Sequence, residues 1–142
     1  MAINNHPHAV AGFLYDRKHN AVLLHLRDGN TKINPNKWSL FAGACEAGET
    51  PLQTFVREIE EEIGLAIDPK EVKFLDEYFN DTTNVFRHVY YIEKYVPLSE
   101  LTLGEGAGMD WVPLEKAFDL DLSEKSIKDL RRFLALLTVS AG

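Results

Sequence analysis

The stretch that decides the fold runs from residue 43 to residue 65 and reads GACEAGETPLQTFVREIEEEIGL. Thr50 followed by Pro51 predicts the start of a helix, because threonine caps helix N-termini and proline fits the first turn. Gly64 predicts its end. At about 100° per residue, the apolar side chains gather in one arc that must face the core. These side chains are Leu52, Phe55, Val56, Ile59 and Ile63.

A second arc of this helix carries three carboxylates, Glu58, Glu61 and Glu62. Like charges at this spacing repel one another, so such an arc is either exposed to solvent or has a function that requires the charges. A solvated acidic face usually contains lysines as partners, whereas Arg57 is the one basic residue in this stretch and could pair with Glu61. Glu60 falls outside both arcs and is expected to face solvent. Clustered carboxylates beside a tight loop suit hard divalent cations such as Mg²⁺ or Mn²⁺.

Outward from this helix, the sequence predicts strands on both sides. Aliphatic, β-branched and aromatic runs bounded by turn residues mark them at residues 9–15, 21–27, 38–41, 72–79, 85–96 and 109–112. A second amphipathic helix is expected over residues 123–138. One side of that helix carries Ile127, Leu130, Phe133, Leu134 and Leu137. Strands mixed with two helices indicate a single α/β domain over residues 1–142 with a mixed sheet.

The composition excludes several classes of protein. The chain has 142 residues, of which 22 are acidic and 15 basic, giving a formal net charge of −7. This balance disfavours an electrostatic grip on nucleic acid or an anionic membrane. No apolar run approaches the roughly 20 residues of a membrane span, and residues 1–8 do not predict a signal peptide. The single cysteine, Cys45, excludes an internal disulfide. We therefore expect a cytoplasmic protein.

The segment 43–65 resembles the Nudix box, Gly-x5-Glu-x7-Arg-Glu-U-x-Glu-Glu-x-Gly-U with U an aliphatic residue, and it matches every fixed position. The resemblance implies the Nudix fold, in which a mixed β-sheet is sandwiched between helices (α/β/α). It also implies Mg²⁺-dependent hydrolysis, with Mn²⁺ as a substitute, of a nucleoside diphosphate linked to another group. Gly43, Glu49, Arg57 and Gly64 are framework positions of the box. Among them, Glu49 would pair with Arg57 and orient the helix and the loop.

The resemblance also implies roles for the carboxylates. Glu58 and Glu62 would bind Mg²⁺, Glu61 would bind the metal or hold a water, and the Gly43 carbonyl would complete the coordination. The general base stays open. Glu58 is one candidate, and Glu105, a catalytic or metal-binding glutamate in a glycine-flanked loop, is another. The weaker alternatives are Asp110 and Glu93.

On the substrate side, Arg27 at the end of the predicted strand 21–27 is the candidate phosphate ligand, because its planar guanidinium matches phosphate oxygens. Lys32 and Lys37 could assist it. A base could stack on an aromatic ring, for which the candidates are Tyr15, Phe79, Phe86 and Tyr90. His25 and His88 lie on predicted strands, as structural or groove-lining residues.

The substrate itself stays open. The compact domain is similar to small Nudix members that convert (deoxy)nucleoside triphosphates, including oxidised ones, to a monophosphate and pyrophosphate. The alternatives are nucleotide sugars, ADP-ribose, dinucleoside polyphosphates and RNA 5′ ends. A non-catalytic nucleotide-binding module is a further alternative, although such modules typically lose the box glutamates that this chain keeps. We expect a small-molecule nucleotide as partner, no membrane and no nucleic acid, with a homodimer as the expected oligomer if the chain associates.

Overall fold

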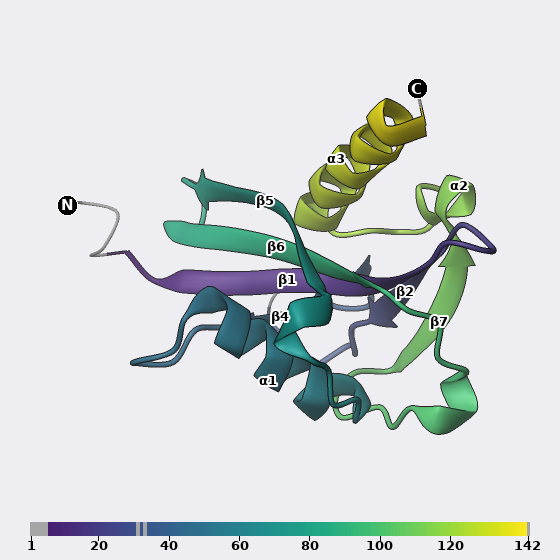
Figure 1. Ribbon diagram of the computed structural model, residues 1–142. Coiled ribbons are helices and arrows are strands. Elements are labelled where there is room, and N and C mark those ends of the chain that lie inside the picture. The colour runs from purple at the N-terminus through teal and green to yellow at the C-terminus, as the bar shows by residue number, and fades with distance from the viewer. Residues whose placement is uncertain (1–5, 31, 33, 142) are drawn as a thin grey trace.

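The computed structural model describes residues 6–30, 32 and 34–141. A mixed sheet lies between the helix α1 (Pro51–Ile63) on one face and the helix α3 (Glu124–Ala141) on the other (Figure 1). The strands are β1 (His8–Asp16), β2 (Ala21–Leu26), β3 (Trp38–Ser39), β4 (Phe41–Ala44), β5 (Val72–Asn80), β6 (Val85–Glu93) and β7 (Gly108–Pro113). Three short helices complete the fold: η2 (Pro69–Glu71), η3 (Leu98–Glu100) and α2 (Leu114–Ala117). This is the α/β/α arrangement expected from the sequence.

The central strand, β1, uses its two edges differently. Along one edge it pairs in parallel with the whole of β6. Along the other edge it pairs with β2 only at Tyr15 and Asp16, and with β4 from Ala9 to Gly12. β2 therefore diverges from β1 and continues between β3 and β7. The pockets described below lie where the end of β2, the strand β4 and the helix α1 meet.

The helix α1 begins and ends where the sequence predicts. The Thr50 hydroxyl accepts from the Gln53 N–H while the Gln53 side chain accepts from the Thr50 N–H, which is a reciprocal capping box. Gly64 adopts the left-handed conformation with φ of 70°, and its N–H donates to the Glu60 carbonyl. The apolar arc is buried against β1 and β4, mainly through Phe55, Ile59 and Ile63.

Each face of the sheet has its own core. Beneath α1 this core includes Val10, Leu14, Leu23 and Phe41. Beneath α3 it includes Phe13, Tyr15 and Tyr91, whose rings all contact Phe133. Leu134, which periodicity places on the same side as Phe133, is 43% exposed. It lies about 100° around the helix from Phe133, outside the narrow arc that reaches the sheet.

Three details differ from the prediction. Residues 38–41 form two strands instead of one, because β3 pairs with β2 whereas β4 pairs with β1. The strand predicted over residues 85–96 ends at Glu93, because β1 ends and the Lys94 N–H makes a last bond to the Tyr15 carbonyl. The sequence also did not predict the three short helices η2, η3 and α2. No helix within the described residues is long and apolar enough to cross a membrane.

Candidate active site

Four carboxylates line one pocket of about 490 Å³ beside the C-terminal half of α1. Three come from the helix, Glu58, Glu61 and Glu62, and the fourth is Glu105 from the loop before β7. The side chains of Glu58 and Glu62 are 12% and 13% exposed, whereas that of Glu61 is 57% exposed. Glu60 is exposed, as its place on the helix predicts. The structure therefore brings the sequence-predicted carboxylates together.

Gly43 on β4 makes room for the Glu58 carboxylate. A Cβ atom at this position would clash with the carboxylate carbon and both carboxylate oxygens of Glu58. Only glycine lets the carboxylate lie directly against the backbone of β4. Any substitution at Gly43 would therefore displace Glu58 from the pocket.

A bidentate ion pair fixes the loop before α1 to the helix. The Arg57 Nε and Nη2 atoms donate to the two Glu49 oxygens at 2.7 and 2.9 Å. The Thr54 hydroxyl and the Glu46 N–H also donate to Glu49, both at 2.9 Å. These donors, Arg57 first, lower the pKa of Glu49 to about 2. The remaining nitrogen of Arg57, Nη1, contacts Glu58 and Glu61 at 2.9 and 3.2 Å.

Thr54 is a site residue that the sequence analysis missed. It is fully buried, although threonine is more often exposed. Its spacing of five residues from Glu49 crosses the start of the helix, so no periodicity connects the two positions. The one available signal was a polar residue beside the apolar arc of α1.

Glu62 differs from Glu49 because one of its oxygens, Oε2, is buried without a hydrogen-bond partner among the described residues. Burial and the nearby Glu58 and Glu105 raise the pKa of Glu62 to about 7. Burial also raises the pKa of Glu58. Nε2 of His25 lies 4.0 Å from Oε2, beyond hydrogen-bond distance. An unpaired buried carboxylate is costly, so this position favours a bound cation.

The donor set fits a hard divalent cation. Within the part of the chain that the structure describes, no group of three or more His, Cys, Asp or Glu side chains is arranged to hold a metal ion by itself. Mg²⁺ does not need one, since it is usually held by one or two carboxylates together with waters and substrate phosphates. The unpartnered oxygen of Glu62 and the Glu58 carboxylate cradled by Gly43 are oxygen donors of this kind. The residues present therefore fit a divalent metal ion.

The loop that carries Glu105 is fastened to the end of α1. The N–H groups of Gly104 and Thr102 donate to the carbonyls of Glu62 and Ile63, at 2.8 and 2.9 Å. These are carbonyls that a helix end otherwise leaves unpaired. The loop can approach this closely because a Cβ at Gly104 would clash with the helix backbone. Glu105 is therefore held opposite the helical carboxylates by backbone bonds.

His25 fixes the same loop from the side of β2. Its Nε2 donates to the Glu105 carbonyl at 2.7 Å, and its ring stacks on Phe41 with centroids 5.1 Å apart. Burial lowers the pKa of His25, which favours the neutral ring. Gly106, at φ of 99°, leaves space for the imidazole. The sequence indicated a structural or groove-lining role for His25, but not its contact with Glu105, 80 residues away.

Arg27, the residue after β2, lines a second pocket next to the first. The two pockets share Ala42, Glu62 and Glu105. A group held at the carboxylates can therefore extend toward the Arg27 side chain, as its candidate role requires.

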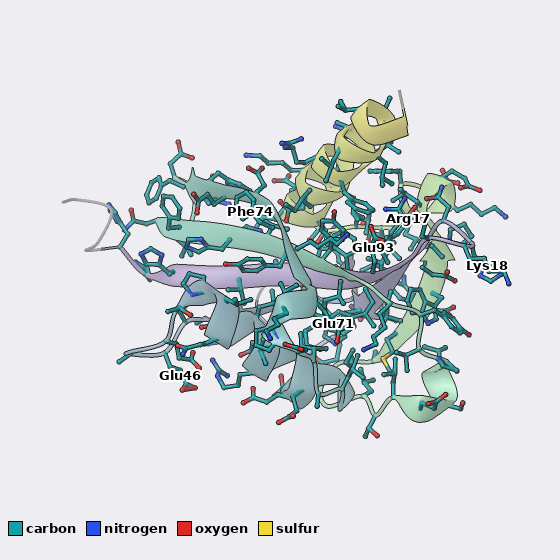
Figure 2. All side chains as sticks on the ribbon, in the orientation of Figure 1. Arg17, Lys18, Glu46, Glu71, Phe74 and Glu93 are labelled. Carbon is teal, nitrogen blue, oxygen red and sulfur yellow. The ribbon has the colours of Figure 1, made fainter. Side chains whose placement is uncertain are left out.

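Other predicted candidates lie elsewhere. Glu93 is ion-paired with Arg17 and lies next to it, away from α1 (Figure 2). Asp110 is exposed on β7 and does not line the carboxylate pocket. Lys37 pairs with Asp121 at 2.9 Å. Lys32 is exposed and lines neither of the two pockets.

The candidate stacking rings also lie away from the carboxylates. Tyr15 is buried in the core beneath α3, where its hydroxyl donates to Asn20. Phe79, Phe86 and Tyr90 belong to β5 and β6, which lie on the opposite side of β1 from β2. None of the four lines either pocket. His88 is on β6 as well, hydrogen-bonded to His8.

Comparisons with known proteins agree with this geometry. The chain is 26% identical over 137 residues to dihydroneopterin triphosphate diphosphatase of Haemophilus influenzae, covering 85% of this chain and 83% of that protein. It is 35% identical over 98 residues to an uncharacterized Nudix hydrolase of Listeria innocua, covering 67% of this chain and 57% of that protein.

Solved structures share the fold. A structure from a study of MutT from Aliivibrio salmonicida and Vibrio cholerae has a TM-score of 0.75 at 22% identity, covering 92% of this chain and 98% of that one. The NUDIX domain of Shewanella oneidensis NrtR, solved with ADP ribose, has a TM-score of 0.74 at 16% identity, covering 91% and 86%. The NUDIX domain model matches residues 5–137. The chain therefore belongs to the Nudix family, whose members generally use divalent metal ions, and it is a Nudix pyrophosphohydrolase.

Proposed function

We propose that this enzyme hydrolyses a (deoxy)nucleoside triphosphate, oxidised ones included, to the monophosphate and pyrophosphate, and that Mg²⁺ is its metal. The observation that carries the proposal is the buried, unpartnered oxygen of Glu62 in a pocket with three further carboxylates. Such a pocket repels a polyanion by itself. It admits a diphosphate only together with divalent cations, which reverse the local charge.

Glu58 and Glu62 are the residues that would hold the metal, with Glu61 and the Gly43 carbonyl as further ligands. The metal, when bound, neutralises the diphosphate and lowers the pKa of a coordinated water. Arg57 orients Glu58 and Glu61 through Nη1.

Two carboxylates can take the proton of the attacking water, Glu105 and Glu58. Glu58 packs on Gly43 and is bound by Arg57, which restricts its movement. Glu105 has no such contact with Arg57 and faces the helical carboxylates across the pocket. We therefore assign the general base to Glu105 and water or metal binding to Glu61.

Arg27 would bind phosphate oxygens in the adjoining pocket, where its guanidinium can donate two parallel bonds. A triphosphate is favoured over other diphosphates by the similarity to the Haemophilus influenzae protein, which is named for a triphosphate substrate. That similarity makes dihydroneopterin triphosphate a second candidate. ADP-ribose, which the Shewanella oneidensis domain binds, is the main alternative outside the triphosphates.

A substrate panel tests the proposal. Triphosphates, dihydroneopterin triphosphate, ADP-ribose and nucleotide sugars would be incubated with Mg²⁺, Mn²⁺ or EDTA, and the released monophosphate, pyrophosphate and phosphate would be quantified. We expect metal-dependent release of monophosphate and pyrophosphate in equal amounts from a triphosphate. Turnover that persists in EDTA, or exclusive cleavage of ADP-ribose, would contradict the proposal.

A further inference from the structure

A third pocket, of about 240 Å³, lies between the sheet and the N-terminal end of α3. The small residues Ala9, Ala42 and Gly43 leave space at its floor. It shares Ala42 and Arg27 with the pocket at the end of β2. One extended ligand can therefore reach from the carboxylates, past Arg27, into this third pocket.

The lining of this pocket is cationic. Of the described residues that line it, three carry a positive charge and none carries a carboxylate; the three are Arg27, Arg87 and Lys125. Its other polar groups are hydroxyls and an amide, on Asn34, Ser39, Ser123 and Ser126. No aromatic side chain among the described residues lines it, so it offers no ring for a base to stack on.

Lys125 differs from Arg87, which is ion-paired with Asp129. Its ammonium group has no hydrogen-bond or ion-pair partner among the described residues. Burial lowers the pKa of Lys125, as do the neighbouring Arg87 and Arg27, whereas the nearby Asp129 acts in the opposite direction. Lys125 therefore lies beside two other cations, one of which, Arg87, is paired with Asp129. Crowded cations around a cavity favour binding of an anion.

Arg87 is held in one orientation. Its Nε and Nη2 atoms both donate to Asp129 on α3, at 3.0 and 2.8 Å, and the Tyr78 hydroxyl also donates to Asp129, at 2.9 Å. Arg87 is 8% exposed and Asp129 is fully buried. The guanidinium therefore forms a rigid wall of the pocket, whereas Lys125 supplies a charge that a ligand can recruit.

We propose that this third pocket binds an anionic group, a phosphate or a carboxylate, that the substrate carries beyond its cleaved diphosphate. The inference rests on the proposed function, which places the diphosphate at the carboxylates. It narrows the substrate class to diphosphates with an additional negative charge, such as the outer phosphate of a triphosphate, a phosphorylated sugar or a uronic acid. A diphosphate joined to two uncharged groups would leave Lys125 without a partner.

The binding step can be tested without any hydrolysis. In EDTA the carboxylate pocket repels anions, so stabilisation by inorganic phosphate reports on a cationic site. We expect increasing phosphate to raise the Tm of the wild-type protein, and the Lys125→Gln variant to bind phosphate about tenfold more weakly, since hydrogen bonds to charged groups are worth roughly this factor. The Lys128→Gln variant is the matched control, because Lys128 packs over the Tyr78 ring and does not line this pocket.

This titration has outcomes that support the proposal and outcomes that contradict it. A wild-type response that the Lys125→Gln variant loses and the Lys128→Gln variant keeps supports the proposal. Absence of stabilisation in the wild type, or equal responses of all three proteins, overturns it. Neither result depends on whether the enzyme hydrolyses triphosphates, so failure of the proposed function would be seen separately.

Matched substrate pairs identify the source of the anion. The pairs are NADP with NAD, UDP-glucuronate with UDP-glucose, and a nucleoside triphosphate with its diphosphate. With Mg²⁺, we expect kcat/KM to favour the charged member of at least one pair by about tenfold, and the Lys125→Gln variant to lose that preference. Equal kcat/KM within every hydrolysed pair would overturn the proposal.

Discussion

Two buried carboxylates, Asp129 on α3 and Glu62 on α1, lie on opposite faces of the sheet and differ in their hydrogen-bond partners. Asp129 is completely buried and accepts hydrogen bonds from Arg87 and Tyr78. Glu62 is nearly as buried, yet its Oε2 has no partner among the described residues. The fold is therefore able to satisfy a buried carboxylate, and it does so on the face where the carboxylate joins α3 to β5 and β6.

This difference separates an architectural group from one reserved for a ligand. Burying an unpaired charge costs several kcal/mol unless the group is protonated. Burial raises the pKa of both carboxylates, so it is the missing hydrogen-bond partner of Glu62 Oε2 that distinguishes the two. In a site that binds metal and diphosphate, an unpartnered carboxylate oxygen is available to bind the metal ion. The following experiments test whether the two carboxylates differ in this way.

The largest effect is expected from Asp129→Ala. It leaves Arg87 buried without its counter-charge, which should lower the free energy of unfolding by about 3–5 kcal/mol. Chemical denaturation would measure the change. The exposed Asp119 provides the control, because Asp119→Ala should change the free energy of unfolding by less than about 0.5 kcal/mol.

An apolar replacement of both partners sharpens this test. In a variant with Arg87→Met and Asp129→Leu no charge is left unpaired, so it should be more stable than Asp129→Ala alone. If the double variant were the less stable of the two, orphaning of Arg87 would not be the source of the cost.

Glu62→Gln should have the opposite profile. We expect activity with Mg²⁺ to fall roughly 100-fold to 1000-fold, as on loss of a group that stabilises charge in the transition state. Metal-free stability should stay the same or rise, since the buried charge is removed. Steady-state kinetics and denaturation in EDTA would measure the two effects.

The matched control for Glu62 is Glu60→Gln, two residues earlier on the same helix but exposed to solvent. It should leave activity and stability near their wild-type values. A Glu62→Gln protein that is destabilised by several kcal/mol in EDTA would show that Glu62 is architectural, like Asp129.

The sequence predicted the region around Glu62 far better than the region around Asp129. The carboxylate arc and the caps belong to one helix, so helical geometry places them. The Glu49–Arg57 pair was expected from the resemblance to the Nudix box, whose spacing is local. Contacts between β6 and α3 depend on the packing of distant elements, which no local periodicity encodes. Arg87, Lys125 and Asp129 were not singled out for this reason.

The same limit applies to the Glu105 loop. Its flanking glycines were a local signal, but its attachment to His25 joins residues 80 positions apart through the pairing of β2 with β7. The break between β3 and β4 was missed because it depends on which strand is the partner. The helix α2 was missed because its four residues are too few for a helical period to show.

A smaller effect is expected at His25, which we interpret as a positioning residue that acts through Glu105. His25→Phe keeps an aromatic ring on Phe41 but removes the donor to the Glu105 carbonyl, so kcat should fall about tenfold with little change in Tm. His25→Gln, which retains a donor, should recover part of the loss. Hydrogen exchange of the Ala107 amide, bonded to the Leu26 carbonyl, would report loosening of the loop.

Coupling to Glu105 is the decisive control for His25. In a Glu105→Ala background, adding His25→Phe should lower kcat by much less than tenfold, because the residue it positions is gone. Additive losses in the double variant would mean that His25 acts independently of Glu105.

The smallest effect concerns stability and pH in the absence of metal. The pKa of Glu62 is about 7 in the folded protein, against an ordinary value of 4.5. Between these values the folded protein binds the proton more tightly than the unfolded chain. The contribution to stability is therefore complete below pH 4.5 and is lost as pH rises through 7.

We expect the loss to be on the order of 1 kcal/mol, because the pocket is open to solvent and screens the charge. Denaturation in EDTA from about pH 5 to about pH 8, a range that brackets the titration, would measure the change in the free energy of unfolding. Glu62→Gln should remove most of this pH dependence of stability. The remainder is due to Glu58, whose pKa is also raised. Saturating Mg²⁺ should stabilise more strongly at the higher pH, because metal and proton compete for the same oxygens. Asp129 is already paired with Arg87 and Tyr78 and is therefore not available to Mg²⁺. If Mg²⁺ stabilised the Glu62→Gln variant as strongly as the wild type, the cation would bind elsewhere than at α1.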